Sequence, residues 1–393
     1  MSLALQAIQR TLAIEQIDGW LLYDFHGSNP IAVKLAGVAG RHTTRRWFYF
    51  IPASGTPKKL VHAIEPFVLD GLEGDVITYA ERRQLEQNVT DMLRGCKVIA
   101  MEYSPECGIP YLSRVDAGTV EFLRRIGMRV VSSGDLVGRF EAAWDDAAIA
   151  THRAASERLY RIKDNAFEYV SAKLSAGDVI GEYEVQQAML GWFADEGLVA
   201  DAAPIVSAQE NAGNPHYAPT ASSSRNIQPD EVVLLDLWGK LNTPGAVYAD
   251  ITWVGFGGDP PAEIANAFGV IVAGRDAAIA RVQSALRAGQ EVQGYQVDRA
   301  ARDLIGAAGY GEYFIHRTGH SLGEEVHGNG VHMDDYETHD DRTLVTGTGF
   351  TIEPGIYTKA FGVRTEINMV VGPKSADVTG PCQQTLVRIR TRP

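Results

Sequence analysis

The sequence predicts an α+β protein in which a smaller α/β domain, residues 1–143, precedes a larger domain, residues 144–393. Three observations lead to this prediction. The 393 residues suffice for two or three domains of about 100–200 residues each. Before about Phe140, short apolar runs alternate with helical stretches. Beyond it, long helical stretches flank a separate cluster of strand-like runs.

The first 140 residues contain four runs rich in β-branched and aromatic residues, which predict strands. These are Gly19 to Tyr23, Trp47 to Ile51, Val76 to Tyr79 and Val98 to Glu102. Helices are predicted near the N-terminus and over Glu86 to Arg94 and Gly118 to Gly127. The N-terminal helix lacks the basic region and unbroken apolar core of a signal peptide. This alternation of strands and helices is typical of an α/β domain.

The larger domain begins near Ala142 to Asp145, where a stretch through Val170 has helical apolar spacing and no Gly or Pro. Further helices are predicted over Glu182 to Glu196, Ala262 to Arg287 and Tyr295 to Ala308. Strands are predicted over Val232 to Trp238, Val247 to Val254, Tyr313 to His316, Gly349 to Ile352 and Arg364 to Val371. Helices that flank mixed or antiparallel strands indicate an α+β domain.

Composition and charge argue against several classes of partner. Apolar residues make up 45% and charged residues 22%, which is normal for a globular protein with a sizeable core. The net charge of −13 argues against nucleic acid or an anionic membrane as a partner. No apolar run approaches the roughly 20 residues of a membrane span. Three cysteines, Cys96, Cys107 and Cys382, are too few for a disulfide framework and fit a reducing compartment. We therefore expect a cytoplasmic protein.

Five residues of the larger domain point to its chemistry: Asp236, Asp250, His320, Glu353 and Glu366. They lie in the short segments LLDLW, YADITW, TGHSLG, TIEPGIY and VRTEIN. An ionised carboxylate is not buried unless it is paired or bound to metal. Four carboxylates near one point would repel each other and take up protons unless cations compensated them. Two divalent cations would balance the four negative charges, so the pattern favours a dinuclear metal site.

The four acids form two similar pairs. Asp236 and Asp250 are 14 residues apart, and Glu353 and Glu366 are 13 apart. In each pair a turn containing Gly and Pro separates two strand-like runs. Each pair fits a hairpin with one carboxylate on each arm, where cross-strand neighbours approach within about 5 Å. We hypothesise a pseudo-twofold duplication, which a structure whose two hairpins fail to superpose would contradict.

The histidines His316 and His320 are spaced i, i+4, as in the helical zinc motif H-E-x-x-H. The residues between them are Arg-Thr-Gly, so there is no glutamate to act as a base, and the glycine weakens a helix. We reject the zinc-helix interpretation for these reasons. On a strand, residues i and i+4 share a face, so both imidazoles would point into one cleft.

Taken together, these motifs resemble the pita-bread metallopeptidases, the family of methionine aminopeptidases, Xaa-Pro aminopeptidases and prolidases. The resemblance is strong over about residues 150–393, and GWLLYDFHGSNPIAVKLAG extends it weakly to the N-terminal domain of creatinase and prolidase. It implies a C-terminal pita-bread fold preceded by a smaller α/β domain. It also implies five metal ligands, Asp236, Asp250, His320, Glu353 and Glu366, among which Asp250 and Glu366 bridge two metals.

The same resemblance implies roles for residues around the metals. His216 would contact substrate near the scissile bond, His327 would stabilise the oxyanion, and Glu353 would handle the proton. His316 would border the proline pocket, and Arg364 matches an arginine of the Xaa-Pro branch that would bind substrate.

The implied reaction is hydrolysis of the peptide bond preceding proline by a metal-bridging hydroxide. Two divalent ions per chain are implied, and carboxylate-rich ligation favours Mn²⁺ over the tolerated Co²⁺ or Zn²⁺. The implied partner is a short proline-containing peptide, and a homodimer is expected from the family. Xaa-Pro dipeptides are the favoured substrates, with Xaa-Pro aminopeptidase action on longer peptides as the alternative. A non-catalytic peptide-binding module and creatinase-like metal-free hydrolysis are disfavoured because all five ligands are present.

Two stretches depart from the family pattern. The 14-residue interval between Asp236 and Asp250 is three longer than usual, which we place in the LNTPGA turn. After His327, the stretch GNGVHMDDYETHDDR is longer and more acidic than expected. Its Gly, Asn and Asp content predicts a solvated loop rather than a second metal site on His332 and His339. Its position beside the site leaves a lid role open.

Overall fold

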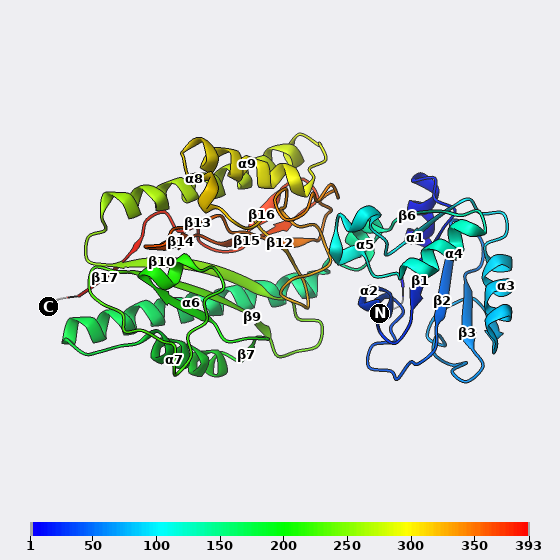
Figure 1. Ribbon diagram of the computed structural model, residues 1–393, viewed down its shortest axis with the longest axis horizontal. Helices are drawn as coiled ribbons and strands as arrows, with labels where there is room; N and C mark the ends of the chain where they lie inside the picture. Colours follow the sequence, from blue (N-terminus) through cyan, green and yellow to red (C-terminus); the bar gives the residue numbers. More distant parts are fainter. Residues whose placement is uncertain (1–2, 392–393) are drawn as a thin grey trace. The chain divides into compact units, whose positions relative to one another are not determined.

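The computed structural model describes residues 3–391. They form two compact units, one ending at Ala142 and the other beginning at Ala143 (Figure 1). Sheets and helices occur in both units, so the predicted α+β class is confirmed. Among the helices of residues 3–391, none combines the length and apolar character that a membrane span requires.

The first unit is built on a mixed six-stranded sheet. Its strands, in spatial order, are β4 (Asp75–Tyr79), β3 (Lys58–His62), β2 (Trp47–Pro52), β1 (Gly19–Asp24), β5 (Val98–Met101) and β6 (Arg129–Ser132). Side chains alternate across the central strand β1. Trp20 and Leu22 pack with α1 (Leu5–Ile14), α2 (Pro30–Leu35) and α5 (Gly134–Phe140). Leu21 and Tyr23 pack with α3 (Arg82–Met92) and α4 (Ala117–Arg125) on the other face. The four predicted strands are confirmed, whereas β3 and β6 are additional.

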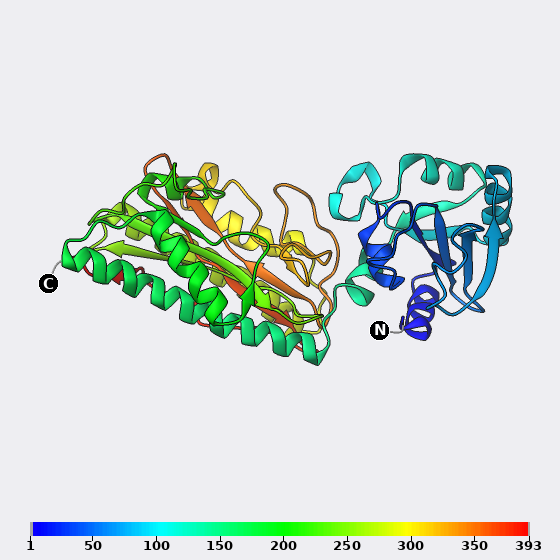
Figure 2. The same ribbon diagram turned by 90° about the horizontal axis from the view of Figure 1, so that it is seen from below.

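The second unit has strands between two helical layers (Figures 1 and 2). Helices α6 (Asp146–Ala176) and α7 (Glu182–Asp195) share a core with the larger of the two sheets of this second unit. The strands of this larger sheet are, in spatial order, β17 (Val387–Ile389), β10 (Ala249–Gly257), β9 (Val232–Leu241) and β7 (Leu198–Val199). A further strand, β8 (Ile205–Ala208), also pairs with β9. Helices α8 (Ala262–Arg287) and α9 (Gly294–Ala307) cover the other side.

A second sheet and a separate hairpin complete this unit. The sheet consists of β11 (Ser321–Leu322), β12 (Gly349–Ile352), β15 (Ile367–Val371) and β16 (Ala376–Val378). Strands β13 (Gly355–Tyr357) and β14 (Gly362–Arg364) form the hairpin. The core of this half joins α8 and α9 to β12 and β15 through residues such as Val282, Ala301, Phe350 and Ile367.

The long helix α6 shows why the sequence folds as predicted here. Its N-cap residue Asp145 accepts a hydrogen bond from the backbone N–H of Ala148 at 2.8 Å, which satisfies one of the free amides of the first turn. Gly177 ends the helix in the left-handed conformation at φ +78°, where glycine carries no steric penalty. Helices α7, α8 and α9 also lie where the sequence predicts them.

Candidate metal centre

The β9–β10 hairpin provides two of the five acidic and imidazole residues. Its antiparallel register pairs Asp236 with Thr252 and Asp250 with Trp238. Directly opposed residues project from the same face of a sheet, so Asp236 and Asp250 share one face with these partners. Both aspartates are buried. The hairpin predicted from the 14-residue interval is therefore confirmed.

The two glutamates lie where the second sheet gives way to the β13–β14 hairpin. Ile352 and Ile367 form the last pair of β12 and β15, so Glu353 and Glu366 follow and precede that pair directly. The backbone N–H of Glu366 donates to the Thr252 carbonyl oxygen at 3.1 Å. This bond to β10 interrupts the strand predicted over Arg364 to Val371, which divides into β14 and β15. The glutamates thus sit on antiparallel arms, just beyond the paired residues.

His320 precedes β11, and its backbone N–H donates to Thr351 Oγ1 at 2.9 Å. Its Nδ1 lies 3.1 Å from the Ser321 carbonyl oxygen, and burial lowers the pKa of His320. A neutral ring with its proton on Nδ1 presents an unprotonated Nε2 to the acids. This Nε2 lies 3.5 Å from Asp250 Oδ2 and 3.4 Å from Glu353 Oε1.

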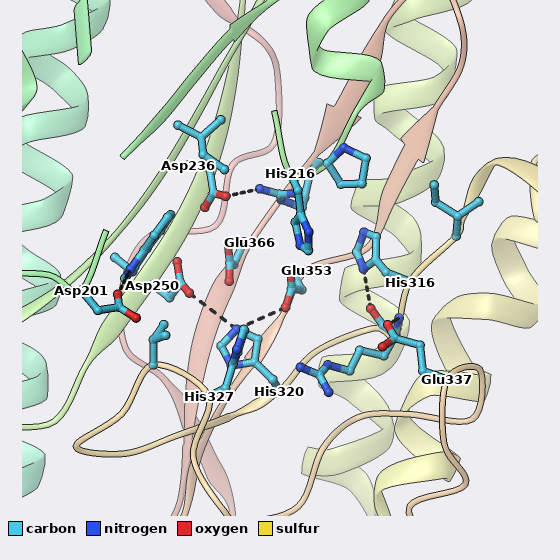
Figure 3. A pocket seen from close by; sticks show the side chains of 17 residues that line it. Asp201, His216, Asp236, Asp250, His316, His320, His327, Glu337, Glu353 and Glu366 are labelled. Atoms are coloured by element: carbon cyan, nitrogen blue, oxygen red, sulfur yellow. Dashed lines mark hydrogen bonds and ion pairs between the residues drawn. The ribbon is translucent and has the colours of Figure 1, made fainter. Parts of the chain in front are cut away.

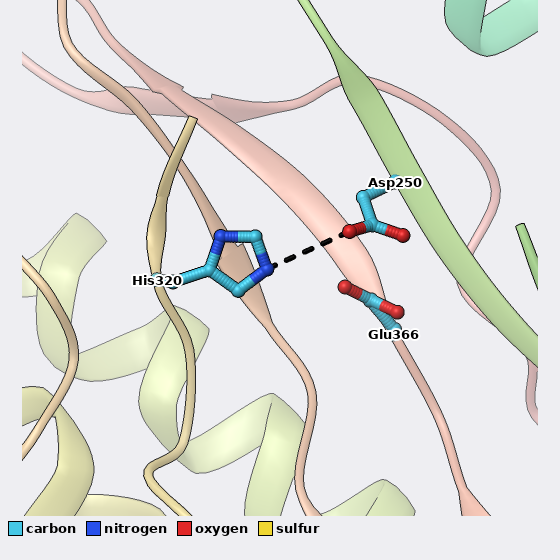
Figure 4. Close-up of side chains that lie close together, drawn as sticks. All are labelled: Asp250, His320 and Glu366. Carbon is cyan, nitrogen blue, oxygen red and sulfur yellow. Dashed lines mark ion pairs between the residues drawn. The ribbon is translucent and has the colours of Figure 1, made fainter. Parts of the chain in front are cut away.

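Three of the five residues form a compact group of possible ligands (Figure 4). One ligand atom from each of Asp250, His320 and Glu366 lies within 4.8 Å of the others. Within residues 3–391, Asp250 Oδ1 and Glu366 Oε1 are buried without a hydrogen-bond partner. Burial, and next the charge of Asp236, raises the pKa of Asp250 well above its usual range. Burial, and next Asp250, does the same to the pKa of Glu366. A divalent cation would satisfy these buried, unpartnered oxygens, so the donor set fits a metal centre.

Asp236 and Glu353 stand outside this three-residue group. Asp236 Oδ2 accepts a hydrogen bond from Arg364 Nη2, and its Oδ1 lies 3.1 Å from Thr252 Oγ1. The buried guanidinium supplies a positive charge that balances this carboxylate. Glu353 Oε1 accepts a hydrogen bond from Thr351 Oγ1 at 3.0 Å.

All five residues nevertheless line one cavity of about 530 Å³ (Figure 3). Its volume lies within the roughly 300–1,000 Å³ of small-molecule sites. The other residues that the sequence assigns to the site, His216, His316, His327 and Arg364, line it too. The structure therefore brings every predicted site residue to one place, although their roles stay predictions.

His316 is fixed by hydrogen bonds on both ring nitrogens. Nδ1 lies 2.7 Å from the Arg317 carbonyl oxygen, and Nε2 lies 2.8 Å from the Tyr357 hydroxyl. Arg364 Nη1 donates to the same hydroxyl at 3.2 Å. Burial, and next the charge of Arg364, lowers the pKa of His316 to about 3. The ring is therefore neutral, and its orientation is set by its partners.

The strand predicted over Tyr313 to His316 is wrong. A 3₁₀ helix, η4 (Gly311–Tyr313), and irregular backbone occupy this segment. Arg302 of α9 donates to the carbonyl oxygens of Phe314 at 3.0 Å and His316 at 2.6 Å. A side chain thus provides hydrogen bonds that a neighbouring strand would otherwise provide. A short apolar run in the sequence does not distinguish a strand from irregular backbone that is held by a side chain.

His216 precedes the five acidic and imidazole residues in the sequence, and His327 lies between His320 and Glu353, but both line the same cavity. The rings of His327 and His320 have centroids 4.4 Å apart and planes at 90°. Burial lowers the pKa of His327 to about 3, so its ring is neutral. The backbone N–H of His216 donates to Asn214 Oδ1 at 3.1 Å.

Four charged or aromatic residues of the cavity wall escaped the sequence analysis: Asp201, Trp238, Arg317 and Glu337. Trp238 Nε1 donates to Asp201 Oδ1 at 2.6 Å, and the Arg317 backbone N–H donates to Glu337 Oε1 at 3.1 Å. The strand period of two could have found Trp238, because it shares the face of Asp236. Loop residues such as Asp201 carry no comparable signal.

The stretch at residues 328–342 is not the solvated loop that its composition predicts. His332, Asp334, Asp340 and Arg342 are buried within it. Arg342 pairs with Asp340 at 2.6 Å and donates to the carbonyl oxygens of residues 329 and 330, each at 2.7 Å. Asp334 Oδ1 accepts the backbone N–H groups of residues 336 and 337, each at 2.9 Å. Paired charges therefore bury a segment whose polarity alone predicts exposure; its lid role stays a prediction.

Comparison with known proteins adds independent findings. The sequence model of metallopeptidase family M24 matches residues 153–373. The chain is 26% identical over 343 residues to the probable dipeptidase PepE of Mycobacterium tuberculosis, covering 86% of this chain and 84% of that protein. It is 39% identical over 163 residues to the Xaa-Pro dipeptidase of Lactobacillus helveticus, covering 41% of this chain and 40% of that protein.

Solved structures resemble the whole chain. Dipeptidase PepE from Mycobacterium ulcerans has a TM-score of 0.72 at 24% identity, covering 98% of this chain and 97% of that one. A prolidase from Thermococcus sibiricus has a TM-score of 0.64 at 22% identity, covering 98% of each chain. At these identities the likeness is one of fold. It confirms the predicted pita-bread domain preceded by a smaller α/β domain.

Proposed function

The chain belongs to metallopeptidase family M24, and from that membership we propose that it is a dinuclear-metal dipeptidase that hydrolyses the bond preceding proline. The family makes it a dipeptidase-like hydrolase; the metal pair and the preference for proline are what we propose. The observation that carries the proposal is the meeting of four carboxylates and one imidazole in one cavity.

The five residues Asp236, Asp250, His320, Glu353 and Glu366 would hold two divalent cations. Hard carboxylate oxygens favour Mn²⁺, with Co²⁺ or Zn²⁺ as alternatives. When bound, the cations would supply a nucleophilic water near neutral pH and polarise a peptide carbonyl. Arg364, whose guanidinium pairs with Asp236, holds that carboxylate in place at the same wall.

Glu353 is suited to move the proton. Burial raises the pKa of Glu353, which brings a carboxyl closer to a proton-transferring group at neutral pH. It would accept a proton from the attacking water and deliver it to the proline nitrogen as the C–N bond breaks. That nitrogen carries no hydrogen in the peptide, so it gains its first proton in this step.

The neutral imidazoles would bind and orient the substrate. His327 would donate an N–H to the carbonyl oxygen as negative charge develops there. His316, held by Tyr357 and the Arg317 carbonyl, would border the proline ring. His216 would contact the substrate near the scissile bond. Because the proline nitrogen carries no hydrogen in the peptide, the pocket needs no hydrogen-bond acceptor for it.

A substrate comparison tests the proposal. The Mn²⁺-loaded protein is expected to cleave Ala-Pro faster than Ala-Ala, and faster than the tripeptide Ala-Pro-Ala. Faster cleavage of Ala-Pro-Ala would favour the Xaa-Pro aminopeptidase alternative. Equal rates on Ala-Pro and Ala-Ala would refute the preference for proline while leaving a dipeptidase.

A homodimer and a cytoplasmic location belong to the same proposal. The first is expected from the family, and the second from the low cysteine content. Light scattering on the purified protein would measure the assembly, with a monomer at micromolar concentration contradicting the expectation.

A further inference from the structure

A buried carboxylate outside the cavity organises the segment that carries His216. Glu182 is the first residue of α7 and is 0% exposed. Its Oε1 accepts hydrogen bonds from the Ala208 backbone N–H at 2.7 Å and from Asn211 Nδ2 at 3.0 Å. Its Oε2 accepts bonds from the Tyr217 hydroxyl at 2.6 Å and the Arg225 backbone N–H at 3.1 Å.

These donors all belong to residues 208–225, here named the His216 segment. Ala208 ends β8, and Arg225 lies beside the bridge between Gly181 and Asn226. One carboxylate therefore holds both ends of the segment and, through Tyr217, its middle. His216 is the immediate neighbour of Tyr217 and lines the cavity.

The first part of the segment has a second anchor. Residues 209–213 form the 3₁₀ helix η3 (Gln209–Gly213), and Gln209 Nε2 donates to the Ala360 carbonyl oxygen at 3.0 Å. The β13–β14 hairpin approaches η3 so closely that a Cβ at Gly362 would lie 1.8 Å from the Ala212 carbonyl oxygen. This part is therefore fixed without Glu182.

The part that contains His216 depends on α7. Within residues 3–391, the hydrogen bonds that residues 214–224 make outside their own segment run to α7 alone. These are the bond from Tyr217 to Glu182 and the bond from the Tyr183 backbone N–H to Ser224 Oγ at 2.9 Å. A hydrogen bond to a carboxylate is stronger than one between neutral groups. We therefore expect the bond from Tyr217 to Glu182 to contribute more than the bond from Tyr183 to Ser224 to holding this part in place.

We propose that Glu182 is a positioning residue that sets the place of His216 in the cavity through Tyr217. The inference rests on the proposed role of His216 in contacting substrate, and it is independent of the metal's identity and of the preference for proline. Glu182 touches no part of the cavity itself, so its effect on catalysis passes through the His216 segment.

The kinetic test uses Tyr217→Phe, which removes one hydroxyl and keeps the ring. The matched control is Tyr169→Phe. The Tyr169 hydroxyl donates to Glu184 at 2.7 Å, and Glu184 lies on α7 like Glu182, but neither Tyr169 nor Glu184 lines the cavity. Tyr217→Phe is expected to lower kcat/KM roughly 10- to 100-fold through misplacement of His216, whereas Tyr169→Phe leaves it unchanged. In a His216→Ala background, Tyr217→Phe should have no further effect, because the two residues act as one unit.

A second measurement does not need activity. The imidazole signals of ¹⁵N-histidine-labelled protein are assigned with His216→Ala and compared in Tyr217→Phe, Glu182→Gln and the control Glu184→Gln. The His216 signal is expected to shift or broaden in the first two variants, while that of buried His152, which does not line the cavity, stays unchanged. If no dipeptide is cleaved yet the His216 signal moves, the proposed function fails and the positioning role stands. An unmoved His216 signal, or an equal kinetic loss with and without His216, would overturn the positioning role.

Discussion

Replacing Glu366 by glutamine should stabilise the metal-free protein while abolishing its response to metal. Glu366 is 2% exposed, and its Oε2 accepts a hydrogen bond from Thr252 Oγ1 at 2.7 Å. Within residues 3–391, its Oε1 and Asp250 Oδ1 are buried without partners. A glutamine keeps an oxygen for Thr252 and replaces the unpartnered Oε1 by an N–H₂ group, which can donate to the neighbouring Asp250 carboxylate. It also removes one of the crowded negative charges.

The structure sets the size of this effect. Two unit charges 4.8 Å apart, the upper limit between the ligand atoms of Asp250 and Glu366, repel by about 3.5 kcal/mol at an effective dielectric constant of about 20. Burial and Asp250 raise the pKa of Glu366, so protonation avoids part of this repulsion. The gain expected on substitution is therefore about 1–2 kcal/mol, similar to one satisfied buried polar group. It corresponds to a Tm higher by roughly 2–8 °C.

Thermal unfolding in EDTA and in excess Mn²⁺ measures both effects. Without metal, Glu366→Gln should unfold at a higher temperature than the unsubstituted protein. With Mn²⁺ at about 100 times its Kd, the unsubstituted protein should gain about 2.7 kcal/mol, and the variant should gain little. Glu168→Gln, on the exposed side of α6, is the control and should follow the unsubstituted protein in both buffers. Destabilisation of Glu366→Gln in EDTA, or an undiminished Mn²⁺ response, would refute the reasoning.

Three further predictions address other residues. His327→Ala should lower kcat about 10²–10³-fold with little change in KM, which steady-state kinetics on Ala-Pro would measure; an unchanged kcat would remove His327 from the mechanism. His339→Ala, on the exposed side of residues 328–342, should leave kcat/KM within about twofold, and a larger loss would place that surface at the substrate. Burial lowers the pKa of His152 to about 4, against about 6.5 when unfolded. The unfolded chain therefore binds more protons between these values, so His152 should reduce stability as pH falls from about 6.5 to 4, by up to about 3 kcal/mol. Denaturant titrations in EDTA should show a flatter pH dependence for His152→Gln, and an unchanged slope would contradict the prediction.

Local signals in the sequence suffice for most of the second unit. Helix α8 lies at Ala262–Arg287, as its apolar spacing predicts. The β9–β10 hairpin follows from two apolar runs and the turn between them. The strand predicted over Tyr313 to His316 fails because the backbone partners of that segment come from Arg302, a residue of another element. Such long-range partners leave no trace in local periodicity.

The candidate site divides in the same way. Each acid embedded in an apolar run can be recognised from the sequence alone, because a buried carboxylate requires a compensating positive charge or metal ion. The contact between Arg364 and Asp236 joins residues far apart in the chain, and the sequence offers no reason to pair them. The burial of Asp340 and Arg342 also escapes prediction, because their mutual pairing reverses what composition indicates. The role proposed for Glu182 also escapes prediction from sequence, because it depends on four hydrogen-bond donors in residues 208–225, a different segment of the chain.

The metal content of the active protein tests the central claim most directly. After dialysis against EDTA and then Mn²⁺, elemental analysis should find two Mn²⁺ per chain, and dipeptide hydrolysis should return in proportion to the metal bound. Asp250→Ala and Glu366→Ala, which remove the proposed bridging ligands, should bind fewer ions and remain inactive. A protein that hydrolyses dipeptides at full rate with no metal bound would contradict the dinuclear site.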